Sequence, residues 1–330
     1  MRMKNKKLWI ATAAAAILLI AVVFEINGVF GSKNTVEIEV VQGEGSSSIA
    51  DTLKRNGVIG NKTIFKVYAR LGGNHIFQKG KHDLSASMGY SGIIKSLEGA
   101  PKVKEHKVLI KEGLEVLEIA DILQKEGLVN RDTFISLAES GSFDYGFLKN
   151  TTGKIKLEGY LFPDTYHFSE NEDEKDIINI MLKNFEEKVV PLYNESGADM
   201  SLDDVVNLAS IVEREAASDE EKPLIASVFL NRMKIGQRLE SDSTLQYMSS
   251  EKKEFLSISE TKDDDPYNTY SHEGLPPGAI SSPGLDSIKA VLYPADSNYL
   301  YFILSEDKSH SVFSETFEEH LQRQKEIQGN

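Results

Sequence analysis

The chain has 330 residues, a formal net charge of −14 and no cysteine. The missing cysteines exclude disulfides, thiolate nucleophiles and cysteine-based zinc sites. The negative charge argues against nucleic-acid and anionic-lipid partners for the main body, although an acidic surface also simply favours solubility. The length allows an N-terminal segment followed by two modest domains or one large domain.

The first predicted element is an apolar helix. Residues 8–24 form a continuous run in which Thr12 is the polar exception. Extended to residue 30, the run is long enough for a membrane span of roughly 20 residues, and four basic residues precede it. We therefore expect a cytoplasmic tail at residues 1–7, a transmembrane anchor at residues 8–30 and an extracytoplasmic body, in a single-pass protein of the cell membrane. A cleaved signal peptide is the alternative, but no A-x-A site follows the run.

The next region contains two copies of one pattern, 70 residues apart. Residues 36–40 alternate in polarity like a strand, and a helical pattern follows. The matching positions are Ile49, Ala50 and Asp51 with Ile119, Ala120 and Asp121, and Gly57 with Gly127. Both glycines suit left-handed helix C-caps. Each copy is predicted as strand, helix, turn and helix, with Asp51 and Asp121 in equivalent structural roles. Residues 35–148 resemble the LysM type of glycan-binding module, and a structural spacer is the equal alternative.

A stretch at residues 149–156 is expected to separate this module from a second domain at residues 155–330. Residues 157–166 then combine Glu158, Tyr160, further aromatic residues and an aspartate. Carbohydrate sites often pair aromatic rings, which stack on sugar faces, with carboxylates, which accept hydrogen bonds from hydroxyl groups. A core strand with a turn at Pro163 is the alternative interpretation.

A long helix is predicted from an N-cap at Ser201, with Asp204 at the third helical position, to about Ala217. Glu213 lies about 80° from the centre of its apolar stripe, on the edge of the buried face. A partly desolvated carboxyl group there suits a general acid; a surface glutamate is the alternative. Glu215 lies about 160° from Glu213 on the same helix and serves as a control position.

The rest of the domain supplies polar clusters. A helix over residues 221–235 contains Asn231 and ends at Gly236, and a polar cluster including Asp242 follows. Residues 263–265 are three aspartates, which we interpret as a solvated run. Residues 267–270 form an expected aromatic, hydrogen-bonding wall, and residues 299–304 and 311–313 predict a terminal hairpin.

Several of these segments together resemble one known family. The segments LEGYLFPDTY, LASIVERE, YNTY and GLPPGAI occur in an order and spacing similar to the endolytic murein transglycosylase family (MltG, or YceG-like). The resemblance covers nearly the whole chain. The family commonly has S-D-P-T preceded by Gln, whereas this chain has Ser243 in place of the proline and Glu240 in place of the glutamine. These departures affect the expected shape of one loop.

The resemblance implies a reaction and a site. Glu213 would be the catalytic acid and base of an endolytic lytic transglycosylase, a lyase that cleaves MurNAc–GlcNAc bonds in nascent peptidoglycan to give 1,6-anhydro-MurNAc ends. An internal sugar hydroxyl replaces water, so the usual second carboxylate is not required. No metal or cofactor is expected. The expected substrate-binding residues are Glu158, Tyr160, Asn231, Asp242, Tyr267, Asn268, Thr269 and Tyr270.

The expected fold class is α+β, with an N-terminal transmembrane helix, a LysM-like repeated module and a mixed α/β catalytic domain. Expected partners are peptidoglycan glycan strands, the cell membrane, and cell-wall elongation proteins such as the peptidoglycan synthases (penicillin-binding proteins), with no nucleic acid. The alternative is a non-catalytic, membrane-anchored wall-binding or scaffold protein, which would not need Glu213. A penicillin-binding hydrolase lacks its S-D-N and K-T-G motifs here, and a zinc peptidase lacks H-E-x-x-H.

Overall fold

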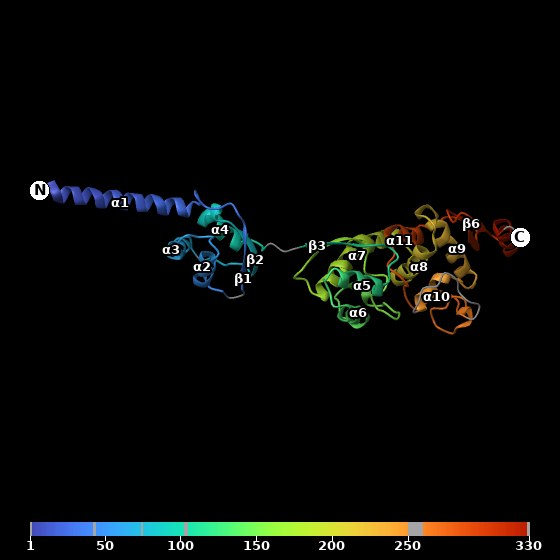
Figure 1. Ribbon diagram of the computed structural model, residues 1–330. Coiled ribbons are helices and arrows are strands. Elements are labelled where there is room, and N and C mark those ends of the chain that lie inside the picture. The colour runs from blue at the N-terminus through green and yellow to red at the C-terminus, as the bar shows by residue number, and fades with distance from the viewer. Residues whose placement is uncertain (1, 42–43, 74, 102–104, 250–259, 329–330) are drawn as a thin grey trace. The chain divides into compact units, whose positions relative to one another are not determined.

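The computed structural model describes residues 2–41, 44–73, 75–101, 105–249 and 260–328. The chain divides into two compact units, Met1–Lys104 and Glu105–Asn330 (Figure 1). Helices predominate in both units. The strands of the described ranges form three separate two-stranded sheets, all antiparallel.

The first unit packs helices on one small sheet. Its elements are α1 (Arg2–Ile26), β1 (Val36–Val40), α2 (Ser46–Arg55), α3 (Lys62–Leu71), β2 (Gly80–Leu84), η1 (Ala86–Met88) and α4 (Gly89–Glu98). Strands β1 and β2 pair from Val36 opposite Leu84 to Val40 opposite Gly80. Alternate side chains of β1 enter the core, which is why the period-two pattern predicted a strand correctly.

The transmembrane expectation is wrong. Helix α1 covers the apolar run, but no helix in the described ranges is both long and apolar enough to cross a membrane. The helix has basic residues in its first two turns and four consecutive alanines in its middle, and it ends at Ile26, short of the predicted residue 30. Near that end, Glu25 accepts hydrogen bonds from the Asn61 N–H and the Tyr90 hydroxyl, each at 2.5 Å. The finding overturns the transmembrane anchor at residues 8–30 and the single-pass cell-membrane location that depended on it.

The repeat appears in the structure with the predicted order of elements. Its second copy consists of β3 (Glu105–Ile110), α5 (Val116–Lys125) and α6 (Arg131–Ser140), and α5 begins and ends 70 residues after α2. Asp51 binds Lys62 at 2.6 Å, and Asp121 binds Arg131 at 2.5 Å. Lys62 and Arg131 are the first residues of α3 and α6. Each aspartate therefore ties the first helix of its copy to the start of the second, as predicted.

The two copies belong to different compact units, because the chain divides after residue 104. The strand of the first copy pairs with β2, whereas that of the second pairs with β4 (Asp164–Ser169). The predicted module at residues 35–148 thus spans this division. The functional assignment of residues 35–148 and 155–330 stays a prediction.

The second unit is built around a buried helix, α8 (Leu202–Glu215). Ser201 caps it, since the Ser201 Oγ accepts the Asp204 N–H at 3.1 Å, as the sequence predicted. Residues 205–212 are all buried. Within this stretch, the Asn207 amide donates to the Pro276 carbonyl and the Ser210 Oγ accepts the Ile280 N–H, which ties α8 to the segment of residues 276–280.

Helix α11 (Leu285–Leu292) contacts α8, α9 (Lys222–Lys234) and α7 (Glu174–Ser196) (Figure 1). The remaining elements are η2 (Gly146–Leu148), η3 (Asp219–Glu221), α10 (Asp242–Met248), η4 (Glu260–Lys262), β5 (Tyr301–Leu304), β6 (Ser311–Ser314) and α12 (Phe317–Gln328). The predicted terminal hairpin is confirmed, because β5 and β6 pair antiparallel. Helix α9 ends at Lys234, close to the predicted end at residue 235. Gly236, just after it, has a φ of 71°.

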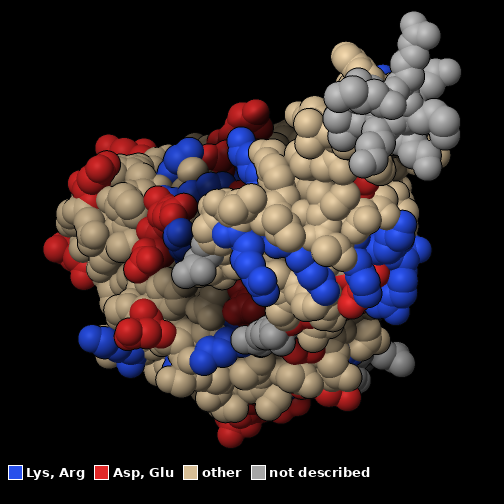
Figure 2. All heavy atoms as spheres, turned by 90° about the vertical axis from the view of Figure 1, so that its left-hand side faces the viewer, with Lys and Arg blue, Asp and Glu red and all other residues tan. Residues whose placement is uncertain are grey.

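The surface mixes both signs of charge. On the face drawn in Figure 2, lysine and arginine side chains lie among aspartate and glutamate side chains. The net charge of −14 is therefore not expressed on this face as a uniform acidic field.

The αL turn of the second copy gives a test of the repeat. Gly127 has a φ of 74°, and a Cβ there would meet nothing within 4 Å. Gly127→Ala should therefore lower the free energy of unfolding by about 1–2 kcal/mol through backbone strain alone. Thermal unfolding measures the loss. Gly146→Ala is the control, because it has equal space and no positive φ; it should not destabilise, and equal effects of both substitutions would contradict the assignment.

Candidate active site

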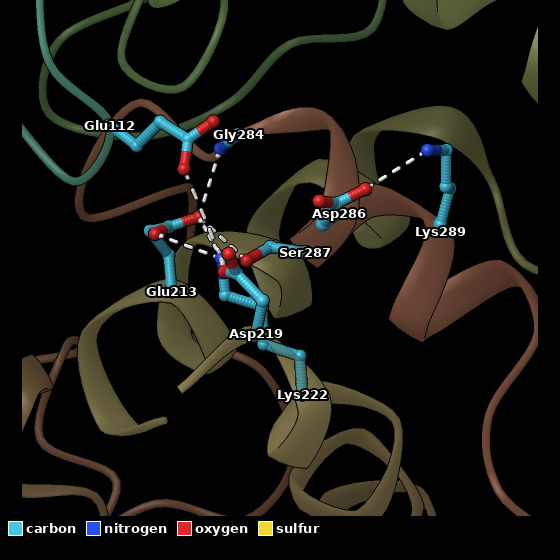
Figure 3. A network of polar contacts seen from close by, with 8 residues as sticks. All are labelled: Glu112, Glu213, Asp219, Lys222, Gly284, Asp286, Ser287 and Lys289. Carbon is cyan, nitrogen blue, oxygen red and sulfur yellow. Dashed lines mark hydrogen bonds and ion pairs between the residues drawn. The ribbon is translucent and has the colours of Figure 1, made fainter. Parts of the chain in front are cut away.

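Glu213 lies in the last turn of α8, where its carboxylate meets three donors (Figure 3). The Gly284 N–H and the Ser287 hydroxyl donate to its Oε2 at 2.9 and 2.6 Å. The Lys222 ammonium lies 3.3 Å from both oxygens. The side chain is 9% exposed, so it sits at the edge of the buried face, as the helical pattern predicted.

Two helix starts supply these donors. Gly284 is the N-cap residue of α11 and Ser287 lies in its first turn. The first N–H groups of a helix have no partner within it, and a negative charge there is stabilising. The Glu213 carboxylate, which belongs to α8, thus accepts hydrogen bonds from donor groups at the start of α11. Lys222 is the first residue of α9, followed by Pro223, which is common at the first positions of a helix.

The Lys222 ammonium is buried among carboxylates. Its side chain is 4% exposed, and it contacts Asp219 at 2.7 Å and Glu112 at 4.0 Å in addition to Glu213. Burial alone would lower the pKa of Lys222, but its hydrogen bond to Asp219 and the charge of Glu213 outweigh burial and raise the pKa. The ammonium group therefore stays charged inside the site.

Glu112 is a second carboxyl group beside Glu213. It precedes α5 in the loop of residues 111–115, and its side chain is half exposed. Its carboxyl group packs so closely on Gly284 that a Cβ there would overlap it. Burial and the charge of Glu213 raise the pKa of Glu112. The two carboxyl groups and Lys222 form one electrostatic unit.

Sequence reasoning gave no role to Glu112, Asp219, Lys222, Gly284 or Ser287. For Lys222 and Gly284, the sequence contains a feature that could have suggested a role. Gly284 lies in the segment that follows GLPPGAI, and Lys222 and Gly284 both lie at starts of helices. Helix starts attract carboxylates, but the sequence does not say which carboxylate reaches which helix.

Glu158 lies beneath the start of α5 and is fully buried. Its oxygens accept the Val116 N–H at 3.1 and 3.3 Å, and the Tyr247 hydroxyl lies 3.4 Å away. Burial, followed by the charge of Glu115, raises the pKa of Glu158 to about 8. The nearby loop of residues 111–115 also meets α8, because Arg214 donates to the Gly113 carbonyl at 3.0 Å.

The aromatic residues expected at the site are largely internal. Tyr160 is 2% exposed, and its hydroxyl donates to Asp203 at 2.5 Å. Tyr267 is 7% exposed, and its hydroxyl accepts the Lys154 N–H at 2.9 Å. The partners of Glu213 in the described ranges include neither residue. Their predicted role in substrate binding stays a prediction.

Other expected residues do come together near the end of α8. The Tyr270 hydroxyl donates to Asp242 at 2.6 Å, and the Thr269 Oγ1 accepts the Ser241 N–H at 3.0 Å. The Ser241 hydroxyl in turn donates to Glu215 at 2.6 Å. Glu215 therefore holds the loop before α10, and it is not the neutral control position that the sequence suggested.

The two expected asparagines support loops. The Asn231 amide donates to the carbonyls of Ser297 and Tyr299 at 2.8 and 3.1 Å. Asn268 is fully buried, and its Oδ1 accepts the Tyr270 N–H at 3.0 Å within a turn. The predicted role of both residues in substrate binding stays a prediction.

Comparisons with known proteins agree with the motifs. The YceG-like family matches residues 38–326. The chain is 32% identical over 302 residues to an endolytic murein transglycosylase of Bacillus subtilis (strain 168), covering 88% of this chain and 84% of the relative. It is 29% identical over 320 residues to an endolytic murein transglycosylase of Streptococcus pneumoniae serotype 2 (strain D39), covering 88% of this chain and 58% of that relative.

A solved structure is also similar. A YceG-like protein of Listeria monocytogenes, known from a crystal structure, shares 31% sequence identity and a TM-score of 0.59 with this chain. The match covers 88% of this chain and 100% of that one.

Glu158 makes stability depend on pH. Its pKa of about 8 in the folded protein lies above its ordinary value of 4.5. Between these values the unfolded chain has released a proton that the folded chain retains, so the free energy of unfolding falls as pH rises. Glu158→Gln should flatten this fall. Melting temperatures from about pH 5 to about pH 8 test it, and curves parallel to those of the unchanged protein would contradict the prediction.

Lys222→Met should destabilise the fold. It leaves the Glu213 carboxylate, which is 9% exposed, without its counter-ion, and breaking a buried ion pair costs about 3–5 kcal/mol. Urea unfolding measures the change. Lys183→Met is the matched control, because the Lys183 side chain is 68% exposed and pairs with Glu187 on the surface of α7; it should cost at most about 0.5 kcal/mol. If the Lys222→Met protein were as stable as the control, the ion pair of Lys222 and Glu213 would not stabilise the fold.

Proposed function

Because the chain belongs to the YceG-like family and is a lytic transglycosylase of peptidoglycan, we propose that Glu213 is its general acid and base. We further propose that it cleaves MurNAc–GlcNAc bonds within glycan strands and leaves 1,6-anhydro-MurNAc ends. The proposed steps need no cofactor.

The observation that carries the proposal is the difference between the two oxygens of Glu213. Its Oε2 accepts hydrogen bonds from Gly284 and Ser287, which hold the side chain in position. In the described part of the chain, the contact of its Oε1 is the longer one to Lys222, at 3.3 Å. Oε1 is therefore the oxygen that can exchange a proton with a substrate while Oε2 stays fixed.

The reaction moves one proton out and one proton back. Protonated Glu213 donates to the glycosidic oxygen, and the bond from that oxygen to muramic C1 breaks. The muramic C6 hydroxyl oxygen then forms a bond to C1 and gives its proton to the Glu213 carboxylate. The enzyme returns to its starting state and no water is consumed.

The surroundings favour a proton within the site. Glu112, Glu213 and Asp219 share the single ammonium of Lys222. Among these groups, burial and the charge of Glu213 raise the pKa of Glu112.

Glu112 is better suited than Glu158 to stabilise positive charge on the sugar. A carboxylate near C1 stabilises the positive charge that develops as the glycosidic bond breaks. Glu158 is fully buried with a pKa of about 8, so it is neutral near pH 7. Glu112 lies beside Glu213 and has access to solvent.

The test is Glu213→Gln in the full chain, with release of anhydro-muramyl ends from purified peptidoglycan measured by mass spectrometry. Loss of a general acid and base costs roughly 10²- to 10⁴-fold in rate, and a group used in both steps should reach the upper end. Glu195→Gln is the control, because Glu195 is exposed on α7. Near wild-type release by a folded Glu213→Gln protein would favour the non-catalytic scaffold alternative.

A second substitution separates chemistry from folding. Glu213→Asp keeps the negative charge that Lys222 needs but withdraws the carboxyl group by one methylene. We expect it to melt close to the unchanged protein and to release anhydro ends at a strongly reduced rate. Products with reducing ends and an added water would instead indicate hydrolysis.

A further inference from the structure

A cavity of about 460 Å³ lies on the outer side of the two helix starts that hold Glu213. It is formed by η3, the first turn of α9, and α11 with the residue that follows it. Asp219 belongs both to the lining of this cavity and to the network of Glu213, because its Oδ1 lies 2.7 Å from the Lys222 ammonium. On α11, the lining residue Asp286 directly precedes Ser287, which donates to Glu213.

The lining has the two kinds of surface that a sugar ring needs. Tyr293 is 53% exposed at the cavity, and Pro223 and Ala290 add apolar surface. Polar groups accompany them, among them the pair of Lys289 with Asp286 at 2.9 Å (Figure 3). An aromatic face suits the C–H face of a pyranose, and the carboxylates and ammonium suit its hydroxyl groups. The volume falls within the range of about 300–1,000 Å³ that is typical of ligand sites.

The charge of the lining selects between the two sugars of the strand. In the lining, Asp219 pairs with Lys222 and Asp286 pairs with Lys289, and Glu220 adds a further negative charge. The excess of negative charge disfavours carboxylates. The N-acetylmuramic unit bears a peptide with carboxylate groups, whereas the N-acetylglucosamine unit is neutral. The cavity is therefore suited to the N-acetylglucosamine unit.

We propose that this cavity binds the N-acetylglucosamine unit that leaves when the glycosidic bond is cut, with the ring of Tyr293 against its sugar face. The proposal rests on the function proposed for Glu213. The cavity shares Asp219 with the Glu213 network, so a sugar bound there adjoins the group proposed to cut the glycosidic bond. Of the two units joined by that bond, the muramic unit provides C1 and the N-acetylglucosamine unit is the leaving group.

The test compares Tyr293→Ala and Tyr293→Phe in the full chain. Loss of a stacked aromatic ring is expected to lower kcat/KM for release of anhydro ends roughly 2- to 10-fold. Tyr293→Phe keeps the ring and should stay near the unchanged value. Phe317→Ala is the matched control, because Phe317 is 52% exposed on α12; it should leave kcat/KM unchanged. Melting temperatures should be alike for the Tyr293 variants, since this side chain is half exposed.

A binding measurement makes the inference independent of turnover. Each Tyr293 substitution is combined with Glu213→Gln, and binding of a neutral N-acetylglucosamine tetramer and of a muramyl peptide is measured by calorimetry. We expect Tyr293→Ala to weaken binding of the tetramer by a similar factor and to leave that of the muramyl peptide unchanged. Weakening of the muramyl peptide alone, or no change for either probe together with unchanged kcat/KM, would overturn the proposal.

The two proposals fail in different ways. If Glu213→Gln retains full release, the acid and base assignment fails, whatever the tetramer does. If Glu213→Gln is inactive while Tyr293→Ala binds and cleaves like the unchanged protein, Glu213 keeps its role and the sugar site at Tyr293 is wrong.

Discussion

The burial of the Lys222 ammonium is the constraint on which the arrangement around Glu213 depends. A charged group with 4% exposure is costly unless other charges and hydrogen bonds compensate it. Glu213, Asp219 and Glu112 provide that compensation from α8, η3 and the loop before α5. Glu213, Asp219 and Lys222 belong to consecutive elements, whereas Glu112 comes from a distant part of the chain. The ammonium therefore ties the loop before α5 to the connection between α8 and α9.

The same arrangement suits the acid and base role proposed for Glu213, because it fixes one carboxylate oxygen and leaves the other with a longer contact. Its Oε2 completes the start of α11. Because Gly284 has no side chain, the Glu112 carboxyl group can pack beside this contact. Its Oε1 has a longer contact, at 3.3 Å, with the Lys222 ammonium. A catalytic group held by a helix start and packed helices is positioned before substrate arrives, which lowers the cost of reaching the reactive geometry. The cavity at Tyr293 is lined in part by residues from the same two helix starts.

The repeat shows how one local pattern serves two contexts. Both copies form a strand and two helices with an acidic tie between the helices, yet the first strand pairs within its own unit and the second pairs with β4. The loop between β3 and α5 thereby lies against α8, where Glu112 meets Lys222 and Arg214 meets Gly113. The second copy thus contributes directly to the surroundings of Glu213.

Features that depend on neighbours along the chain could be predicted from the sequence. The cap at Ser201, the αL glycines and the edge position of Glu213 follow from hydrogen bonds and periodicities within a few residues. The tertiary structure alone decided that Glu158 lies beneath α5, that Glu215 holds a loop, and that Lys222 and Glu112 face Glu213. Burial and charge pairing depend on which segments come into contact in space. One pattern of residue types along the chain is compatible with several different tertiary contacts.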